Sequence, residues 1–368
     1  EYGRPFIDRI AGITRFMDVK PSIRRNIVSL LFLQGANYIF PLITLPWFTR
    51  TLGPDGFGRI GFATAFCMYF SLLSDYGFNL SATRQFAIHR DNQAEGSRIF
   101  WSTFTTKFIL SFVGFLLLLF LCIIMPRLAQ ERTLLVTGYL SVVGTVLTPV
   151  WYFQGIERLT VLTKVNLTAR IITLPVIFIL VRSKDDVLLA MLITSTTGLI
   201  AGCLSILAMI RLNKILWAPP SFFDIWCALH DGWHLFVSSA AVSLYTTSNT
   251  VILGFIAGNA EVGYFTAAQR LIKAAQSMVT PLSQAVYPRI SHLMQSSRDD
   301  AFVLIRKVLR VQGIITLVLS LVLLIGASVA VEIAFGQSYV ASVPVLRWLA
   351  PLPFFIGLSN VFGVQAML

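Results

Sequence analysis

The sequence predicts an all-α integral membrane protein, and three observations predict it. Its composition is 56% hydrophobic and only 12% charged, with a mean hydropathy of +0.75, far outside the usage of soluble domains. Apolar runs of about 20 residues recur along the chain, which is the length that a helix needs to cross hydrocarbon. The roughly ten-residue alternation of a spanning β-barrel is absent from the sequence. A polytopic helix bundle is therefore the predicted fold class.

Ten apolar runs are predicted to span the membrane, with short loops between them. The predicted spans are residues 26–48, 60–80, 101–125, 134–156, 161–182, 187–210, 232–256, 262–286, 311–335 and 343–367. They imply four parts, namely a polar N-terminal arm (1–25), an N-half of six spans (26–210), a linker (211–231) and a C-half of four spans (232–368). The chain opens on Glu1 and stops at Leu368 inside an apolar run, so we expect a piece of a longer protein with a truncated C-half.

Lys and Arg residues are divided unequally between the two sides of the predicted bundle. Counting alternate loops places 18 of them on the side of the N-terminal arm, Lys107 included, and 7 on the other side. Because cytoplasmic loops carry the excess of Lys and Arg, the arm and the 211–231 linker are predicted to be cytoplasmic. The net charge of +12 forms no block or stripe with interleaved aromatic residues, so a nucleic-acid partner is not predicted.

A short stretch at residues 52–63 returns in weaker form at residues 257–268. One pair of glycines has the same spacing in both blocks, and it is Gly53 and Gly58 in the first block and Gly258 and Gly263 in the second. Glycine and proline cannot continue the flanking helices, so the first block is predicted to be a polar hinge between two spans. The copy indicates two related halves that run in the same direction, which implies a repeat axis along the membrane normal.

Polar and charged side chains occur at helical spacing inside two predicted spans. The span 262–286 carries Thr266, Arg270, Lys273, Ser277, Thr280 and Gln284, and the span 161–182 carries Thr163, Asn166, Arg170 and Thr173. Hydrogen bonds between helices explain the Ser and Thr residues, but a cation in mid-bilayer costs about 2.5–3.5 kcal/mol on insertion scales. A water-filled cavity removes much of this cost. We therefore predict that Arg170, Arg270 and Lys273 line a cavity and bind an anionic ligand.

Two further positions have two interpretations each. Asp75 is the one acid well inside a span, and it is expected either to pair with Arg84 or to bind a coupling proton or sodium ion. Trp151 ends the fourth span beside Gln154, where an aromatic belt at the membrane interface is the default interpretation and stacking on a sugar ring is the alternative.

No enzyme motif is found in the sequence. Walker, GxSxG, HExxH and paired-Asp motifs are absent, and the loops on the extracytoplasmic side are too short to hold an active site. The cysteines lack the paired spacing of a metal site or a disulfide framework, and they are Cys67, Cys122, Cys203 and Cys227. No catalytic residue, metal or cofactor is therefore predicted.

Five motifs together resemble the O-antigen and polysaccharide flippases. They are residues 45–58 (LPWFTRTLGPDGFG), 75–84 (DYGFNLSATR), 149–157 (PVWYFQGIE), 243–247 (SLYTT) and 287–291 (YPRIS). The first of them is specific to the family, and the resemblance covers residues 26–368. These proteins form the polysaccharide-transporter branch of the superfamily that also holds multidrug and toxic-compound extruders and the peptidoglycan-precursor flippase.

The resemblance implies two six-helix lobes around a central cavity that opens alternately to either side of the bacterial cytoplasmic membrane. The implied substrate is an undecaprenyl-diphosphate-linked oligosaccharide, moved from the inner to the outer leaflet. Membrane lipids are implied partners, as are the polysaccharide polymerase and the chain-length machinery. The predicted sites are a diphosphate site at Arg170, Arg270 and Lys273, a coupling site at Asp75, and sugar contacts at Asn37, Tyr38, Trp151 and Gln154.

Two alternatives are considered, one of them another kind of transporter and the other an enzyme. A cation-coupled exporter of drugs or amphiphiles is expected to show more acid than base in its cavity, because its substrates are cationic, whereas the predicted balance here favours base. A membrane polysaccharide polymerase needs a large extracytoplasmic loop with catalytic Arg or His residues, and the predicted loops are short. A flippase is therefore the favoured function.

Overall fold

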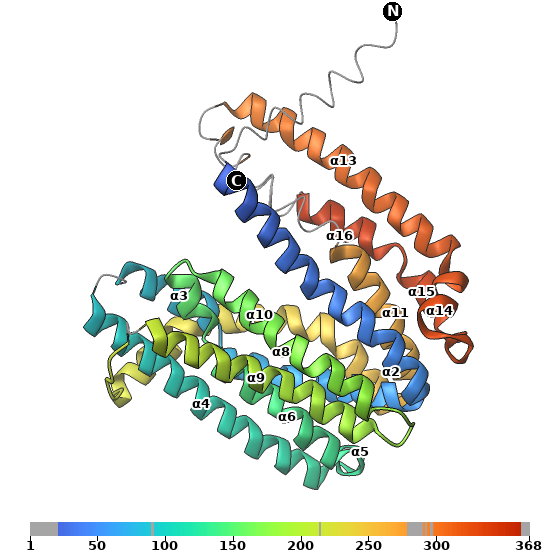
Figure 1. Ribbon diagram of the computed structural model, residues 1–368, viewed down its shortest axis with the longest axis horizontal. Helices are drawn as coiled ribbons and strands as arrows, with labels where there is room; N and C mark the ends of the chain where they lie inside the picture. Colours follow the sequence, from blue (N-terminus) through green and yellow to red (C-terminus); the bar gives the residue numbers. More distant parts are fainter. Residues whose placement is uncertain are drawn as a thin grey trace, which may run out of the picture.

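The computed structural model describes residues 21–89, 92–212, 215–277, 290, 293–294 and 297–361, with side chains at residue 40 and from residue 43 onward. These residues form helices joined by short connections, and they include no strand (Figure 1). The elements are α2 (Pro21–Asp75), α3 (Phe78–Ile88), α4 (Gln93–Ile124), α5 (Pro126–Gln130), α6 (Arg132–Leu147), α7 (Val150–Gly155), α8 (Leu159–Leu180), α9 (Val187–Leu212), α10 (Phe222–Ile256), α11 (Asn259–Ser277), α13 (Arg298–Ile325), α14 (Ala327–Phe335), the 3-10 helix η2 (Gln337–Tyr339), α15 (Ser342–Leu349) and α16 (Leu352–Asn360). The predicted all-α fold class is confirmed.

Eight helical segments within the described residues are long and apolar enough to cross a membrane. They correspond to eight of the ten predicted spans. The other two are 26–48, most of whose side chains lie outside the described residues, and 262–286, of which α11 is described only to Ser277. The total of ten spans therefore stays a prediction. One boundary differs, because α13 runs from Arg298 to Ile325 and the predicted span 311–335 takes in part of α13 and all of α14.

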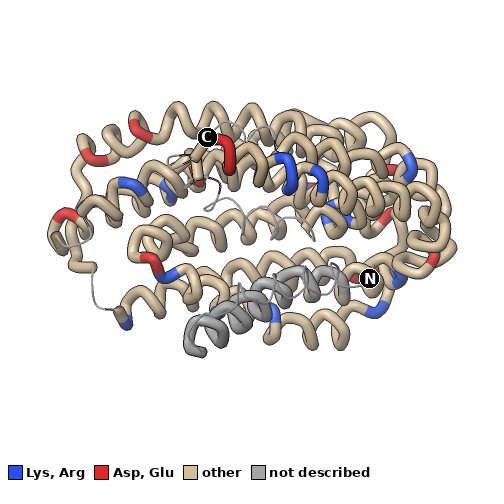
Figure 2. Tube along the Cα trace, turned by 90° about the horizontal axis from the view of Figure 1, so that it is seen from above, with Lys and Arg blue, Asp and Glu red and all other residues tan. Residues whose placement is uncertain are grey.

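The outer faces of these helices are apolar. Along α4, exposed side chains recur at helical spacing, and they are Phe108, Phe112, Leu116, Phe120 and Ile123. Figure 2 shows how sparse charged residues are along the helices. An exposed apolar face of this extent requires a covering that is not water, and lipid hydrocarbon is the covering that a multi-pass membrane protein has.

The two glycine blocks adopt related backbone conformations. Gly53 and Gly258, which are equivalent in the repeat, have φ values of +67° and +121°, in the region that favours glycine. Gly53 is the one non-helical position inside α2, which therefore consists of two helices joined at a sharp turn. The predicted hinge is thus confirmed at Gly53, but it is shorter than expected because the helix resumes directly after it.

Equivalent positions of the two blocks also contact each other. A Cβ atom on Gly58 would lie 1.7 Å from the backbone oxygen of Asn259, and one on Gly263 would lie 2.1 Å from the backbone oxygen of Pro54. Because Pro54 and Asn259 are equivalent in the repeat, the contact is reciprocal, as it is between the partners of a two-fold pair. The repeat seen in the sequence therefore has a structural basis, which is the close crossing of α2 and α11.

Replacing Gly58 by Ala should lower the melting temperature of the purified protein. The added methyl group has no room against Asn259, and forced separation of packed helices costs about 1–3 kcal/mol. Gly313→Ala is the matched control, because its Cβ would meet only one side-chain atom, at 3.7 Å on Leu358. Equal melting temperatures for the two variants would show that the α2–α11 crossing does not need glycine.

The two halves are bonded to each other beside these turns, at what we call the glycine-turn end. Arg50 in α2 donates from Nη2 to the backbone oxygen of Ile333 in α14, at 2.8 Å. Arg127 in α5 donates from Nε to the Gly254 oxygen at 3.0 Å and from Nη2 to Oδ1 of Asn259. In Figure 1, α13 and α16 lie apart from α4, α8 and α9, and the two groups come together where α2, α11 and α14 meet.

Candidate binding site

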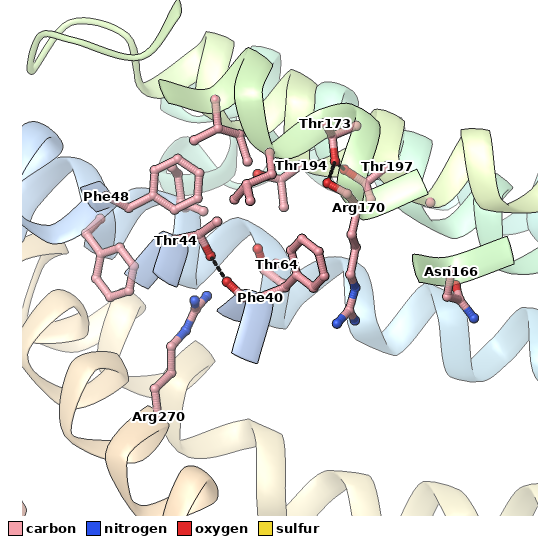
Figure 3. Close-up of a pocket in the computed structure, with 15 residues that line it drawn as sticks. Phe40, Thr44, Phe48, Thr64, Asn166, Arg170, Thr173, Thr194, Thr197 and Arg270 are labelled. Carbon is pink, nitrogen blue, oxygen red and sulfur yellow. Dashed lines mark hydrogen bonds between the residues drawn. The ribbon is translucent and has the colours of Figure 1, made fainter. Parts of the chain in front are cut away.

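A cavity of about 340 Å³ lies where helices of the N-half meet α11 of the C-half. Its wall combines aromatic and aliphatic groups with hydroxyl, amide and guanidinium groups (Figure 3). The lining residues are Phe40, Thr44, Phe48, Phe57, Ile60 and Thr64 of α2, Asn166, Arg170, Thr173, Leu174 and Ile177 of α8, Thr194, Thr197 and Gly198 of α9, and Arg270 of α11. We call this cavity the inter-half pocket.

Two arginines extend into the inter-half pocket from different helices. Arg170 comes from α8 and Arg270 from α11, and Figure 3 shows both side chains reaching into the same space. Both residues are partly buried. The guanidinium carbon of Arg270 lies 5.1 Å from the centre of the Phe57 ring. The prediction that these two cations line a cavity agrees with this geometry, and the two sides of the pocket each present a fork of N–H donors.

Threonine hydroxyls form a polar strip on the α8–α9 wall. The Thr173 hydroxyl donates to the backbone oxygen of Ala169 at 3.0 Å, and the Thr197 hydroxyl lies 3.0 Å from that of Thr173. Thr194 donates to its own helix backbone, to the Ala190 oxygen at 2.6 Å. Because these hydroxyls donate their protons within the protein, their remaining lone pairs can accept hydrogen bonds from a ligand.

Other predicted site residues lie elsewhere. Lys273 is exposed and is not among the residues that line the inter-half pocket, so the structure does not bring it into the site with Arg270. Three residues turn an α-helix through about 300°, so the Lys273 side chain points about 60° away from the direction of Arg270. This difference is enough to turn Lys273 off the pocket face. The side chains of Asn37 and Tyr38 lie outside the described residues, as do Thr280 and Gln284.

Trp151 is fully buried, with 0% of its surface exposed. Its ring packs 5.1 Å from Phe100 and 6.2 Å from Phe86, in a core that also holds Tyr152. An interfacial belt position is therefore wrong, and a sugar cannot reach the ring in this conformation. Gln154 beside it is exposed and is not among the residues that line the inter-half pocket.

Asp75 pairs with Lys107, not with Arg84. Its Oδ1 accepts from Lys107 Nζ at 2.6 Å, and the Lys107 side chain is only 1% exposed while that of Asp75 is 30% exposed. Arg84 is exposed. Lys107 therefore does not belong among the cytoplasmic cations. Without Lys107 in the count, that side still has the excess of Lys and Arg. A buried ammonium group needs this carboxylate, because an unpaired buried charge is strongly destabilising.

The chain turns sharply straight after Asp75. Tyr76 and Gly77 both have positive φ values, of 41° and 79°. The Tyr76 ring stacks on Phe236 of α10, with ring centroids 4.6 Å apart. The Asp75–Lys107 pair thus lies next to a turn that contacts the first helix of the C-half. Within the part of the chain that the structure describes, no group of three or more His, Cys, Asp or Glu residues could hold a metal ion.

Three features of the site were missed in the sequence. Phe57 was treated only as part of a motif, and Thr194 and Thr197 were not singled out. Lys107 had a usable signal, because a lysine inside the run FTTKFILSF requires an opposite charge at a similar depth. The only acid inside a neighbouring span was Asp75, so the pair was open to prediction.

The chain is similar to known proteins over most of its length. Residues 23–294 match the family described as "Polysaccharide biosynthesis protein". A protein of Escherichia coli (strain K12), provisionally named an O-antigen transporter, is 38% identical over 349 residues, which cover 95% of this chain and 84% of the relative. A protein of Shigella dysenteriae with the same name is 34% identical over 277 residues, covering 74% of this chain and 68% of the relative.

A solved structure shares the fold. It is the inward-facing conformation of a multidrug resistance MATE family transporter of the MOP superfamily, and it matches with a TM-score of 0.64. The match covers 89% of this chain and 81% of that chain, at 13% sequence identity. The helix bundle therefore has the fold of this transporter.

Proposed function

Because the chain belongs to the polysaccharide biosynthesis protein family, we propose that it is a flippase for an undecaprenyl-diphosphate-linked oligosaccharide of a surface polysaccharide. The observation that carries this proposal is the inter-half pocket, in which Arg170 and Arg270 reach into one space from different halves of the chain. Guanidinium groups match phosphate oxygens with paired N–H donors. A diphosphate is therefore the part of the substrate that the two arginines hold.

The rest of the substrate fits the other groups of the pocket. Sugar hydroxyls can bond to the amide of Asn166 and to the hydroxyls of the threonine strip. The polyprenyl tail stays in the bilayer beside the bundle, because moving it into water or a polar pocket would cost hydrophobic free energy. The protein then has to shield only the charged and hydroxylated head group during its crossing.

A second candidate, an exporter of cationic amphiphiles, fits the pocket less well. The described lining of the pocket includes two guanidinium groups and no carboxylate. This positive charge repels a cation. Asp75 is paired with Lys107 and does not line the pocket. The charge of the pocket therefore supports an anionic substrate.

We propose that transport proceeds by alternating access, and the bonds that join the two halves at the glycine-turn end support this. This conformation is closed there by Arg50 on Ile333 and by Arg127 on Gly254 and Asn259. Opening at that end would break these bonds and part α2 from α11. Each is a charge-assisted bond to a neutral acceptor, worth about 1.5–3 kcal/mol. The closed and open states can therefore be close enough in free energy to interconvert.

The glycine-turn end is proposed to face the outside of the cytoplasmic membrane, with the N-terminus in the cytoplasm. The Lys and Arg excess on the opposite side supports this assignment. On the outer side, the polysaccharide polymerase and the chain-length machinery would receive the flipped unit. Asp75 is proposed to take part in coupling transport to a proton or cation gradient.

Cysteines introduced at Asp55 and Glu261 should react with a membrane-impermeant thiol reagent added outside the cell, whereas one at Asp299 should not. All three positions are exposed, the first two at the glycine-turn end and the third in the first turn of α13. The native exposed Cys203 and half-buried Cys227 are first replaced by Ser to remove background labelling. The reverse labelling pattern would overturn the assignment of sides.

Deletion of the gene tests the transport function itself. Lipid-linked oligosaccharide should accumulate on the inner leaflet of the cytoplasmic membrane, because synthesis continues there while translocation stops. The leaflet is identified by glycosidase digestion of spheroplasts, before and after permeabilisation. Accumulation of single, unpolymerised units on the outer leaflet would instead indicate a polymerase defect and would contradict a flippase.

A further inference from the structure

The contact of Arg270 differs from those of Lys107 and Arg59. Lys107 is neutralised by Asp75, and Arg59 makes a two-pronged ion pair with Glu131 at 2.9 and 3.0 Å. Among the described residues, no carboxylate lies within ion-pair distance of Arg270, and its contact is the face of the Phe57 ring. Arg270 therefore keeps its charge while it is held in place.

The Phe57 ring is a fixed support. Its side chain is 1% exposed, and the Tyr339 ring meets it edge-on with centroids 6.4 Å apart. Tyr339 is itself fully buried and packs on Phe335 and Tyr264, at 5.5 and 5.9 Å between ring centroids. A ring enclosed in this way has little freedom to change rotamer, so a cation over its face is held with it.

An aromatic support suits an anion site better than a carboxylate support. The ring face attracts the guanidinium through its quadrupole but takes none of its N–H groups as conventional hydrogen bonds. The donors at the guanidinium edges stay available for phosphate oxygens. A carboxylate at the same place would use those donors and cancel the charge.

We propose that Phe57 is a positioning residue of the anion site, and that it holds Arg270 in the inter-half pocket only while α2 and α11 are packed together. The inference rests on the proposed function, because it concerns the same site. Phe57 directly precedes Gly58 in α2, and Arg270 lies on α11, so the ring and the guanidinium come from different halves. The contact depends on the α2–α11 crossing and is lost when the crossing opens.

This arrangement gives the pocket two affinities for one ligand. With the glycine-turn end closed, Arg270 is held beside the diphosphate, together with Arg170. When that end opens, Arg270 leaves the ring and moves with α11, so the pocket holds the diphosphate less tightly and releases it toward the opened side. A conformational change can release a ligand only through such a difference in affinity between the two states.

Binding of inorganic pyrophosphate to the purified full chain in lipid nanodiscs tests the proposal. Phe57→Leu should raise the dissociation constant about 2- to 30-fold, the range that loss of a cation–π contact gives. Phe57→Tyr should bind like the wild type, because it keeps the aromatic ring. Phe100→Leu is the matched control, because Phe100 is as buried as Phe57, at 1% exposed, and does not line the inter-half pocket. It should bind like the wild type. Phe57→Met replaces Phe57→Leu if the latter fails to fold.

A double variant separates positioning from a general loss of structure. In an Arg270→Gln background, Phe57→Leu should cause no further change in the dissociation constant, because the cation that the ring holds is gone. A Phe57→Leu protein that binds pyrophosphate like the wild type, while Arg270→Gln binds it weakly, would overturn the role of Phe57 and leave the anion site intact. Wild-type protein that does not bind pyrophosphate, or Arg270→Gln protein that binds it normally, would overturn the anion site itself. An equal further loss from Phe57→Leu in both backgrounds would also overturn the positioning role.

Discussion

Cells whose copy of this protein carries both Arg170→Gln and Arg270→Gln should display little or no surface polysaccharide, at a wild-type level of the protein. Glutamine keeps hydrogen-bonding capacity and much of the side-chain volume but removes both charges that face the inter-half pocket. Each charge-assisted bond is worth about 1.5–3 kcal/mol, so losing two weakens the hold on a diphosphate by on the order of 10²–10⁴-fold. Membrane insertion should be at least as good, because two charges no longer enter the bilayer.

Lys273→Gln is the matched control for this loss. Lys273 lies one helical turn from Arg270 but is exposed and does not line the pocket, so the same loss of a cation there should leave display near normal. Arg270→Lys should do less harm than Arg270→Gln, because it keeps the charge and loses only the planar fork. Normal display by the double Gln variant, at the wild-type protein level, would remove both arginines from the substrate path.

Replacing Asp75 by Asn should sharply lower the amount of folded protein. Asn keeps the shape of the side chain but leaves the Lys107 ammonium, which is 1% exposed, without a counter-charge. Breaking a buried pair from one side costs about 3–5 kcal/mol. Lys107→Met should cost less, because the Asp75 carboxylate that it leaves behind is 30% exposed and can be hydrated. The readouts are the melting temperature and the monodisperse fraction in detergent.

The double variant Asp75→Asn with Lys107→Met then separates structure from coupling. It removes both charges, so folded protein should return close to the wild-type level. If Asp75 carries a coupling proton or cation, the double variant folds but does not transport. Full transport by the double variant would leave Asp75 with a structural role alone, and wild-type stability of Asp75→Asn would contradict the buried pair.

The sequence was sufficient for those features that depend on burial along one helix. Arg170 and Arg270 were found because a cation inside an apolar run needs water or a partner, wherever the neighbouring helices lie. Gly53 and Gly258 were found because a repeated spacing of glycines survives in the chain itself, and both glycines adopt positive φ values. Reasoning of this kind does not need to know which helices touch.

Features that depend on contacts between helices were not predicted. Trp151 ends a span, as belt residues do, yet it is fully buried in a core that includes Phe86 of α3 and Phe100 of α4. The support of Arg270 by Phe57 joins residues from different halves, and no local rule relates the two positions. Lys273 shows the limit at short range, since a rotation within one turn of α11 separates an exposed cation from one that lines the pocket.

Reconstitution of the purified protein tests its transport function most directly. Undecaprenyl-diphosphate-linked oligosaccharide from a deletion strain is placed in both leaflets of lipid vesicles, and an impermeant glycosidase is added outside. In protein-free vesicles only the outer-leaflet pool is digested. Wild-type protein should make the inner pool digestible as well, and the Arg170→Gln, Arg270→Gln protein should not. Vesicles with folded wild-type protein that protect the inner pool as fully as protein-free vesicles do would contradict flippase activity.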